Sequence, residues 1–360
     1  MCGEENNMTK FDLYIQKLKV NFRNSGIISP LTASYEITAL CNLSCEHCYN
    51  KNENKTSEIS SLFKKKEIIS KLKDLGVLDL SICGGELFMD KDTIPVIKHA
   101  KSVGLRVVVL TNGLLITTEI IAQLKSILDE NDIIQLSIDD IVDNGESKQR
   151  HLNSEQKTAT LNCLKELIKE NINVVVNITP TVLNQNYIID IVKKVDALGL
   201  KNIGVTPYVP MGGKNADIIK PDYRLLSAVH KTVFDYAKSR GMNYGGGIEG
   251  HICQSFIEHN TSNALQNGFS MRRCDASEFN IHISSNGNIY PCVFMERQDF
   301  LIANICDTIE KIKVNMKKVN DKIKVELPHK CVSCHLIYEC GGGCPGLILD
   351  RDRKSTRLNS

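Results

Sequence analysis

Short apolar runs alternate with helical patterns over the first two thirds of the chain. Six runs rich in Val, Ile and Leu are predicted as strands, and they cover residues 34–38, 77–83, 105–110, 132–138, 172–179 and 201–206. Between them, leucines and isoleucines recur every three or four positions, as in residues 61–75 and 155–170, which predicts amphipathic helices. Strands with few polar residues, separated by such helices, are typical of a parallel sheet covered by helices. The sequence therefore predicts an α/β fold.

The number of these units bears on the architecture. Six β-α units favour an open or partial (β/α)6 barrel of the TIM type over the full barrel, which needs about eight. A Rossmann-type doubly wound sheet has the same alternation, so the pattern alone leaves both architectures open.

The two ends of the chain differ from this alternating region. Near the start, Phe11, Ile15 and Leu18 have the spacing of one short amphipathic helix. After the glycine-rich sequence GGGIEG the apolar periodicity is weak and cysteines become frequent, which predicts a loop-rich module stabilised by metal instead of a large core. We expect an N-terminal extension over residues 1–30, a core domain over 31–244 and a second, cysteine-rich domain over 245–351.

Composition and charge exclude several classes of function. The 360 residues include 44 Lys+Arg and 42 Asp+Glu, and the net charge of +2 is spread along the chain, so nucleic acid is a poor candidate partner. No stretch reaches about 18 consecutive apolar residues and the first residues do not form a signal peptide, so we expect a cytoplasmic protein without a membrane partner. In that compartment 14 cysteines indicate metal or cluster ligation in preference to disulfides.

The first group of cysteines directly follows the first predicted strand. In the segment ALCNLSCEHCYN, Cys41, Cys45 and Cys48 form a C-x3-C-x2-C array. Three thiolates from one loop leave one iron of a 4Fe-4S cluster without a protein ligand, and a small molecule can bind there. A zinc site completed by His47 is the alternative, although neighbouring His47 and Cys48 would converge poorly on one tetrahedral ion.

With this array, followed by the aromatic residue Tyr49, the chain resembles the radical S-adenosylmethionine (radical SAM) superfamily over most of residues 31–345. The resemblance implies that the open iron chelates the amino and carboxylate groups of SAM. One electron from the cluster would then cleave SAM to methionine and a 5′-deoxyadenosyl radical, which abstracts a hydrogen from the substrate. A reduced flavodoxin or ferredoxin is the implied electron donor.

The resemblance also implies residues that contact SAM. Gly84, Gly85 and Glu86 follow the second predicted strand, where the family carries a Gly-Gly-Glu motif for the methionine ammonium group, although Leu87 replaces the family's usual proline. An ordinary Gly-Gly turn is the alternative. The other implied contacts lie at or after strand ends and comprise Tyr49, Asn112 in the sequence Thr-Asn-Gly, Ser137, Asp139 and Arg150. For Arg150, a solvated loop arginine is the alternative.

A second group of cysteines lies near the C-terminus. Cys274, Gly287 and Cys292 form C-x12-G-x4-C, and four further cysteines form C-x2-C-x5-C-x3-C. Both spacings resemble the SPASM domain, which binds two auxiliary 4Fe-4S clusters; a zinc site is the alternative. The resemblance implies a first auxiliary cluster on Cys274, Cys292 and Cys344, with Cys253 as the candidate fourth ligand. It implies a second cluster on Cys331, Cys334, Cys340 and a later cysteine that the sequence does not contain.

The last residues offer one explanation for the missing ligand. Residues 352–360, DRKSTRLNS, resemble the translation of a sequencing-library adapter. We interpret them as a non-native tail and expect the natural SPASM domain to be truncated at about residue 351. An ordinary basic tail is the alternative.

Most SPASM-containing relatives modify peptides or proteins, so the resemblance implies that the substrate is a ribosomally made peptide or protein that is crosslinked or oxidised. The alternatives are a sulfatase-type formylglycine maturase, a small-molecule enzyme of the haem-pathway type, and a non-catalytic iron-sulfur or zinc scaffold. Val293 stands where sulfatase maturases carry a catalytic aspartate. Residues 1–30 are too short for a leader-peptide recognition domain, and no residue stands out as a catalytic base.

Overall fold

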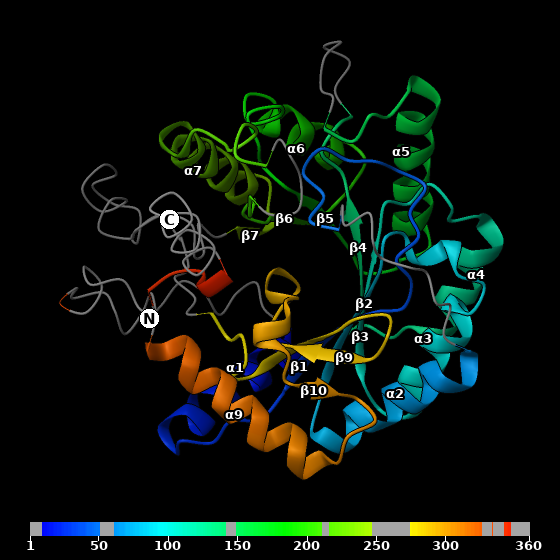
Figure 1. Cartoon of the computed structure of the whole chain (residues 1–360). Coiled ribbons are helices and arrows are strands. Elements are labelled where there is room, and N and C mark those ends of the chain that lie inside the picture. Colours follow the sequence, from blue (N-terminus) through cyan, green and yellow to red (C-terminus); the bar gives the residue numbers. More distant parts are fainter. Residues whose placement is uncertain are drawn as a thin grey trace.

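The computed structural model describes residues 9–50, 61–141, 149–210, 216–246, 274–325, 333 and 342–346. In Figure 1, helices surround a strongly curved sheet. The sheet contains β1 (Thr32–Glu36), β2 (Asp79–Cys83), β3 (Arg106–Thr111), β4 (Ile133–Ser137), β5 (Val174–Ile178), β6 (Asn202–Val205), β7 (Asn243–Gly246), β8 (Asn280–Ile283), β9 (Asn288–Tyr290) and β10 (Ala303–Asn304). The helices are α1 (Lys10–Asn24), α2 (Leu62–Leu75), α3 (Thr93–Ser102), α4 (Thr118–Ile127), α5 (Ser154–Lys169), α6 (Ile188–Asp196), α7 (Tyr223–Ser239) and α9 (Ile309–Val325).

The order of the strands is β10-β9-β8-β1-β2-β3-β4-β5-β6-β7. Neighbours from β1 to β7 are parallel, β8 is parallel to β1, and β9 is antiparallel to both β8 and β10. An open, curved, mainly parallel sheet with helices outside it confirms the predicted partial barrel. The doubly wound alternative is wrong, because the strands follow one another in chain order from β1 to β7.

All six predicted strands are present, and the two predicted helices agree with α2 and α5 to within one residue at each end. Alternate strand residues pack against the helices, and among the buried ones are Ile82, Val109 and Leu136. Cys163 is also buried in this core, as its place on the apolar face of a helix predicts. Strand β7 is not evident in the sequence, because Asn-Tyr-Gly-Gly contains no apolar run.

The region from residue 274 to 325 has more regular structure than the sequence indicates. Strand β8 adds to the same sheet as the core, and Phe279, Ile281, Ile289 and Phe300 are almost completely buried. Sequence periodicity underestimates this core because its strands are only two to four residues long. The domain boundary near residue 245 stays a prediction, since residues 247–273 lie outside the described part.

Helix α1 confirms the amphipathic pattern near the start of the chain. Its first turn is fixed by a capping box between Thr9 and Asp12. Its basic residues then reach the segment before β8: Lys19 Nζ lies 2.6 Å from an Asp275 oxygen, and Arg23 Nη2 lies 2.8 Å from Glu278 Oε2. The N-terminal helix therefore anchors the segment that carries Cys274.

None of the helices in the described part of the chain combines the length and the apolar content that a membrane span requires.

Candidate active site

The predicted SAM and cluster residues lie beyond the carboxyl ends of four neighbouring strands. The cysteine loop follows β1, the Gly-Gly-Glu turn follows β2, Asn112 follows β3 and Asp139 follows β4. Ser137 is the last residue of β4. Because these strands are parallel and adjacent, their carboxyl ends lie at one rim of the barrel, where TIM-type barrels carry their active sites.

The Gly-Gly-Glu turn packs directly on the chain that leads into the cysteine loop. Gly85 N donates to Thr38 O at 2.9 Å, and Glu86 N donates to Leu40 O at 2.7 Å. A Cβ atom would lie 2.6 Å from Thr38 O at Gly84 and 2.3 Å from Leu40 O at Gly85. Only glycine fits at these two positions, which explains the motif by close backbone approach.

The carboxylate of Glu86 is buried and held by the end of β3. Thr111 Oγ1 donates to Oε1 at 2.7 Å, and Asn112 N donates to Oε2 at 2.7 Å. Burial raises the pKa of Glu86, while these hydrogen bonds partly offset the shift. The Asn112 side chain continues the contact into the cysteine loop, since its Nδ2 donates to Asn42 Oδ1 at 2.8 Å.

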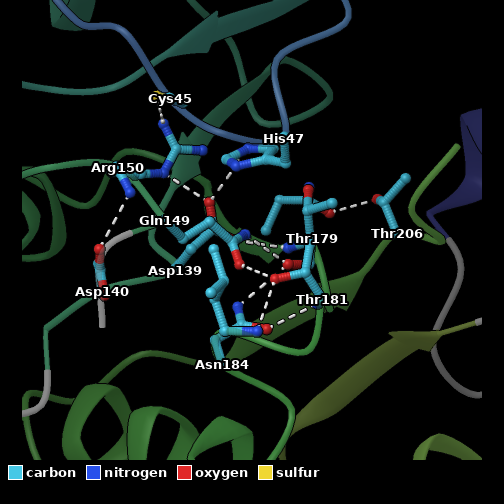
Figure 2. Close-up of polar contacts among 12 residues, drawn as sticks. Cys45, His47, Asp139, Asp140, Gln149, Arg150, Thr179, Thr181, Asn184 and Thr206 are labelled. Atoms are coloured by element: carbon cyan, nitrogen blue, oxygen red, sulfur yellow. Dashed lines mark hydrogen bonds and ion pairs between the residues drawn. The ribbon is translucent and has the colours of Figure 1, made fainter. Parts of the chain in front are cut away.

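Asp139 and Arg150, predicted separately as SAM contacts, form an ion pair beside the cysteine loop (Figure 2). Arg150 Nε lies 2.5 Å from Asp139 Oδ2, and Arg150 Nη1 lies 3.9 Å from Cys45 Sγ. Burial alone would lower the pKa of Arg150, but Asp139 and then Cys45 raise it, so the guanidinium stays charged. His47, the alternative zinc ligand, places Nε2 3.6 Å from the same Asp139 oxygen.

Residues 149–151 hold the cysteine loop from a second side. Glu46 N donates to Gln149 O at 2.8 Å, and His151 Nε2 lies 2.7 Å from Glu46 Oε1. The fully buried side chain of Gln149 donates to Thr179 O and accepts from Thr181 Oγ1. Sequence reasoning missed these contacts, because glutamine and threonine in loops carry no spacing signal.

The three thiols of the first array differ in exposure. Cys45 is buried, Cys48 is half-buried and Cys41 is exposed. Burial, with smaller contributions from Cys48, Asp139 and Cys41, raises the pKa of Cys45 to about 11, while Arg150 opposes the shift. The thiols are therefore near enough to influence one another, as one ligand set requires. One exposed and two shielded sulfurs also suit a cluster that is reached from one side.

Three cysteines of the second group are also close together. Burial, followed by the proximity of Cys274 and Cys344, raises the pKa of Cys292. Gly287 turns the chain between β8 and β9 with φ of +83°, which explains the glycine of C-x12-G-x4-C. The other predicted ligands, Cys253, Cys331, Cys334 and Cys340, lie outside the described residues.

The two cysteine groups approach each other through an aromatic contact. The Tyr49 ring, next to Cys48, packs edge-on against the Phe294 ring with centroids 5.7 Å apart. Phe294 N in turn donates to Cys292 Sγ at 3.3 Å. Tyr49, predicted as a SAM contact, therefore also packs against the cysteine-rich region.

Comparisons with known proteins agree with this geometry. Residues 35–195 match the sequence model of the radical SAM superfamily. The chain is 28% identical to the antilisterial bacteriocin subtilosin biosynthesis protein AlbA of Bacillus subtilis, over 87% of this chain and 67% of AlbA. It is 24% identical to the mycofactocin maturase MftC of Mycolicibacterium smegmatis, over 89% of this chain and 79% of MftC.

The fold is similar to that of a solved relative. The structure of Streptococcus suis SuiB bound to S-adenosylmethionine superposes with a TM-score of 0.72 at 20% identity, over 94% of this chain and 80% of SuiB. The matched sequence model covers the C-x3-C-x2-C loop. Residues 35–195 of this chain, which carry that loop, belong to the radical SAM superfamily.

Proposed function

We propose that the protein cleaves SAM reductively and abstracts a hydrogen from a peptide substrate. The observation that carries this proposal is the direct hydrogen bonding at the barrel rim between the Gly-Gly-Glu turn and the chain that leads into the cysteine loop. Membership of the family implies a 4Fe-4S cluster and SAM as cofactors. When bound, these groups supply a one-electron cleavage of SAM that generates the hydrogen-abstracting species.

The residues at the rim fit these cofactors. Cys41, Cys45 and Cys48 would hold the cluster and leave one iron open. Gly84 and Gly85 present backbone without side chains, and Glu86 is a fixed acceptor for an ammonium group. Supporting polar groups for the rest of SAM would come from Tyr49, Asn112, Ser137, Asp139 and Arg150.

The Asp139–Arg150 pair would act on the cluster ligands as well as on SAM. Its guanidinium lies 3.9 Å from Cys45 Sγ and is charged, which favours the thiolate form that binds iron. Asp139 also accepts from Thr179 N at 2.5 Å, so the pair is anchored to the chain that follows β5.

We further propose one or two auxiliary 4Fe-4S clusters. The mutual proximity of Cys274, Cys292 and Cys344 supports the first of them, with Cys253 as a fourth ligand. Cys331, Cys334 and Cys340 would hold a second cluster. An auxiliary cluster could accept the second electron when the substrate is oxidised, and a reduced flavodoxin or ferredoxin would supply the electron for SAM.

A ribosomally made peptide or protein is the proposed substrate. The names of the relatives AlbA and MftC refer to bacteriocin biosynthesis and to maturation, and both matches span most of this chain. The modification would be a crosslink or an oxidation, each of which removes two hydrogens from the peptide.

The test uses candidate precursor peptides encoded beside the gene, synthesised with deuterated side chains. With the reconstituted enzyme, dithionite and SAM, we expect deuterium in the 5′-deoxyadenosine and a peptide lighter by the two lost hydrogens, both measured by mass spectrometry. If 5′-deoxyadenosine forms but takes up no deuterium from any of the peptides, the peptide assignment is wrong and a small-molecule substrate becomes the better candidate.

A further inference from the structure

Three potential metal ligands without sulfur meet where the core strands join the C-terminal strands. Glu36 is the last residue of β1, His282 lies on β8, and Glu296 follows a short 3-10 helix, Val293–Met295. One ligand atom from each residue lies within 4.8 Å of the other two. Among the residues that the structure describes, no cysteine belongs to this group, which we call the Glu-His-Glu cluster.

The strand register explains why these side chains meet. Ala33 and Tyr35 belong to the apolar core under the helices, so Ser34 and Glu36 point to the opposite face, inside the barrel. His282 is the partner of Ser34 in the parallel pairing of β1 with β8. Its ring therefore lies on the same face as Glu36, one strand away.

The Ser34 hydroxyl fixes the orientation of the His282 imidazole. Ser34 Oγ lies 2.9 Å from His282 Nδ1. A hydroxyl beside Nδ1 holds the ring in one orientation, and Nε2 would then be the nitrogen that binds an ion. This arrangement is the one that supports metal-binding histidines in proteins.

Charge and burial favour a cation at the centre of the cluster. Glu36 and His282 are fully buried and Glu296 is half-buried. Two ionised carboxylates at this spacing repel each other, and burial increases the free-energy cost of keeping both of them charged. A protonated His282 would neutralise one of the two negative charges, whereas a divalent cation bound to both carboxylates and a neutral imidazole would neutralise both.

We propose that Glu36, His282 and Glu296 bind a divalent first-row transition metal ion. Two oxygens and one nitrogen suit Mn²⁺, Fe²⁺ or Zn²⁺, and thiolate-preferring ions are disfavoured. With three protein ligands the ion keeps coordination positions for water or a substrate group. The proposal does not depend on the proposed SAM chemistry.

The position of the cluster gives such an ion a role in both halves of the molecule. Glu36 precedes the cysteine loop by five residues, and Glu296 follows Cys292 by four. A metal that joins β1 to the chain after Cys292 would fix the C-terminal region on the barrel.

The test titrates Mn²⁺ anaerobically into the full-length protein after iron-sulfur reconstitution, so that the cluster-forming thiols are occupied. Unbound Mn²⁺ gives a six-line electron paramagnetic resonance spectrum that is lost on binding. We expect one Mn²⁺ per chain. Ser34→Ala, which removes the support of the imidazole, should weaken binding by about 10- to 100-fold. Ligand variants His282→Ala and Glu296→Gln should weaken it more.

His99→Ala is the matched control. His99, on α3, is a half-buried imidazole that likewise has a serine hydroxyl, Ser70 Oγ, at 2.9 Å, but it is not part of the Glu-His-Glu cluster. It should bind Mn²⁺ as the wild type does. Glu296→Gln is isosteric and half-buried, so it should keep the fold, as judged by circular dichroism and iron content. No Mn²⁺ bound by the wild type, or equal affinity in Glu296→Gln and the wild type, would overturn the proposal.

Discussion

At the scale of single residues, the backbone of the Gly-Gly-Glu turn determines how closely the cysteine loop can lie against it. Sequence spacing predicted Cys41, Cys45 and Cys48, and together with the family resemblance it predicted Glu86. It did not identify Asn42 or Gln149. Their hydrogen bonds depend on which loops the fold brings together, and neither residue type marks a site by itself.

Gly85→Ala tests the close approach at this turn. The new Cβ would lie 2.3 Å from Leu40 O, so the backbone has to move, and we expect the free energy of unfolding to fall by about 1–3 kcal/mol. Iron incorporation into the first array should fall as well. Urea unfolding and iron analysis measure both effects.

Gly245→Ala is the control for that substitution, because its added Cβ would lie 3.9 Å from the nearest atom, Ile203 O. Its stability and iron content should stay close to those of the wild type. Equal behaviour of the two alanine variants would mean that the turn tolerates a side chain.

At the scale of elements, local periodicity predicts strands β1 to β6 but not strand β7 or the short C-terminal strands. Strands β1 to β6 are apolar runs between helices, and each is present. Strand β7 has the sequence Asn-Tyr-Gly-Gly, and β10 has two residues. Such strands form because a neighbouring strand of the sheet is available for backbone hydrogen bonding. A short stretch of sequence contains no information about that neighbour.

Arg23→Ala tests whether α1 holds the segment before β8. The guanidinium contacts Asp275 and Glu278 and lies 5.0 Å from the centre of the Phe279 ring. Loss of a partly buried ion-pair network and of a cation–π contact should lower the free energy of unfolding by about 1 kcal/mol, measured by urea unfolding.

Lys231→Ala provides the comparison, since Lys231 pairs with Asp235 one turn away on the exposed face of α7. A change of only about 0.3–0.5 kcal/mol is expected there. If the two variants are destabilised equally, α1 does not anchor the C-terminal strands.

At the scale of the whole molecule, one continuous sheet joins the barrel strand before the cysteine loop to the strands between Cys274 and Cys292. The pairing of β1 with β8 joins residues about 250 positions apart in the sequence, and the ring contact between Tyr49 and Phe294 brings the chain of Cys48 close to the chain of Cys292. Periodicity predicted the barrel and the cysteine-rich region separately. Their junction could not be predicted, because the register between distant strands is set by tertiary packing and leaves no local pattern.

The most direct test of the central claim is SAM cleavage by the reconstituted protein. Under anaerobic conditions with dithionite and SAM, wild-type protein should produce 5′-deoxyadenosine, measured by liquid chromatography. Cys45→Ala removes the buried thiol of the first array and should abolish this product while the absorbance of the proposed auxiliary clusters remains. Cys306→Ala, an exposed cysteine outside both spacing patterns, should leave the product unchanged. Product from Cys45→Ala at the wild-type rate, or none from the wild-type protein loaded with iron, would contradict the account.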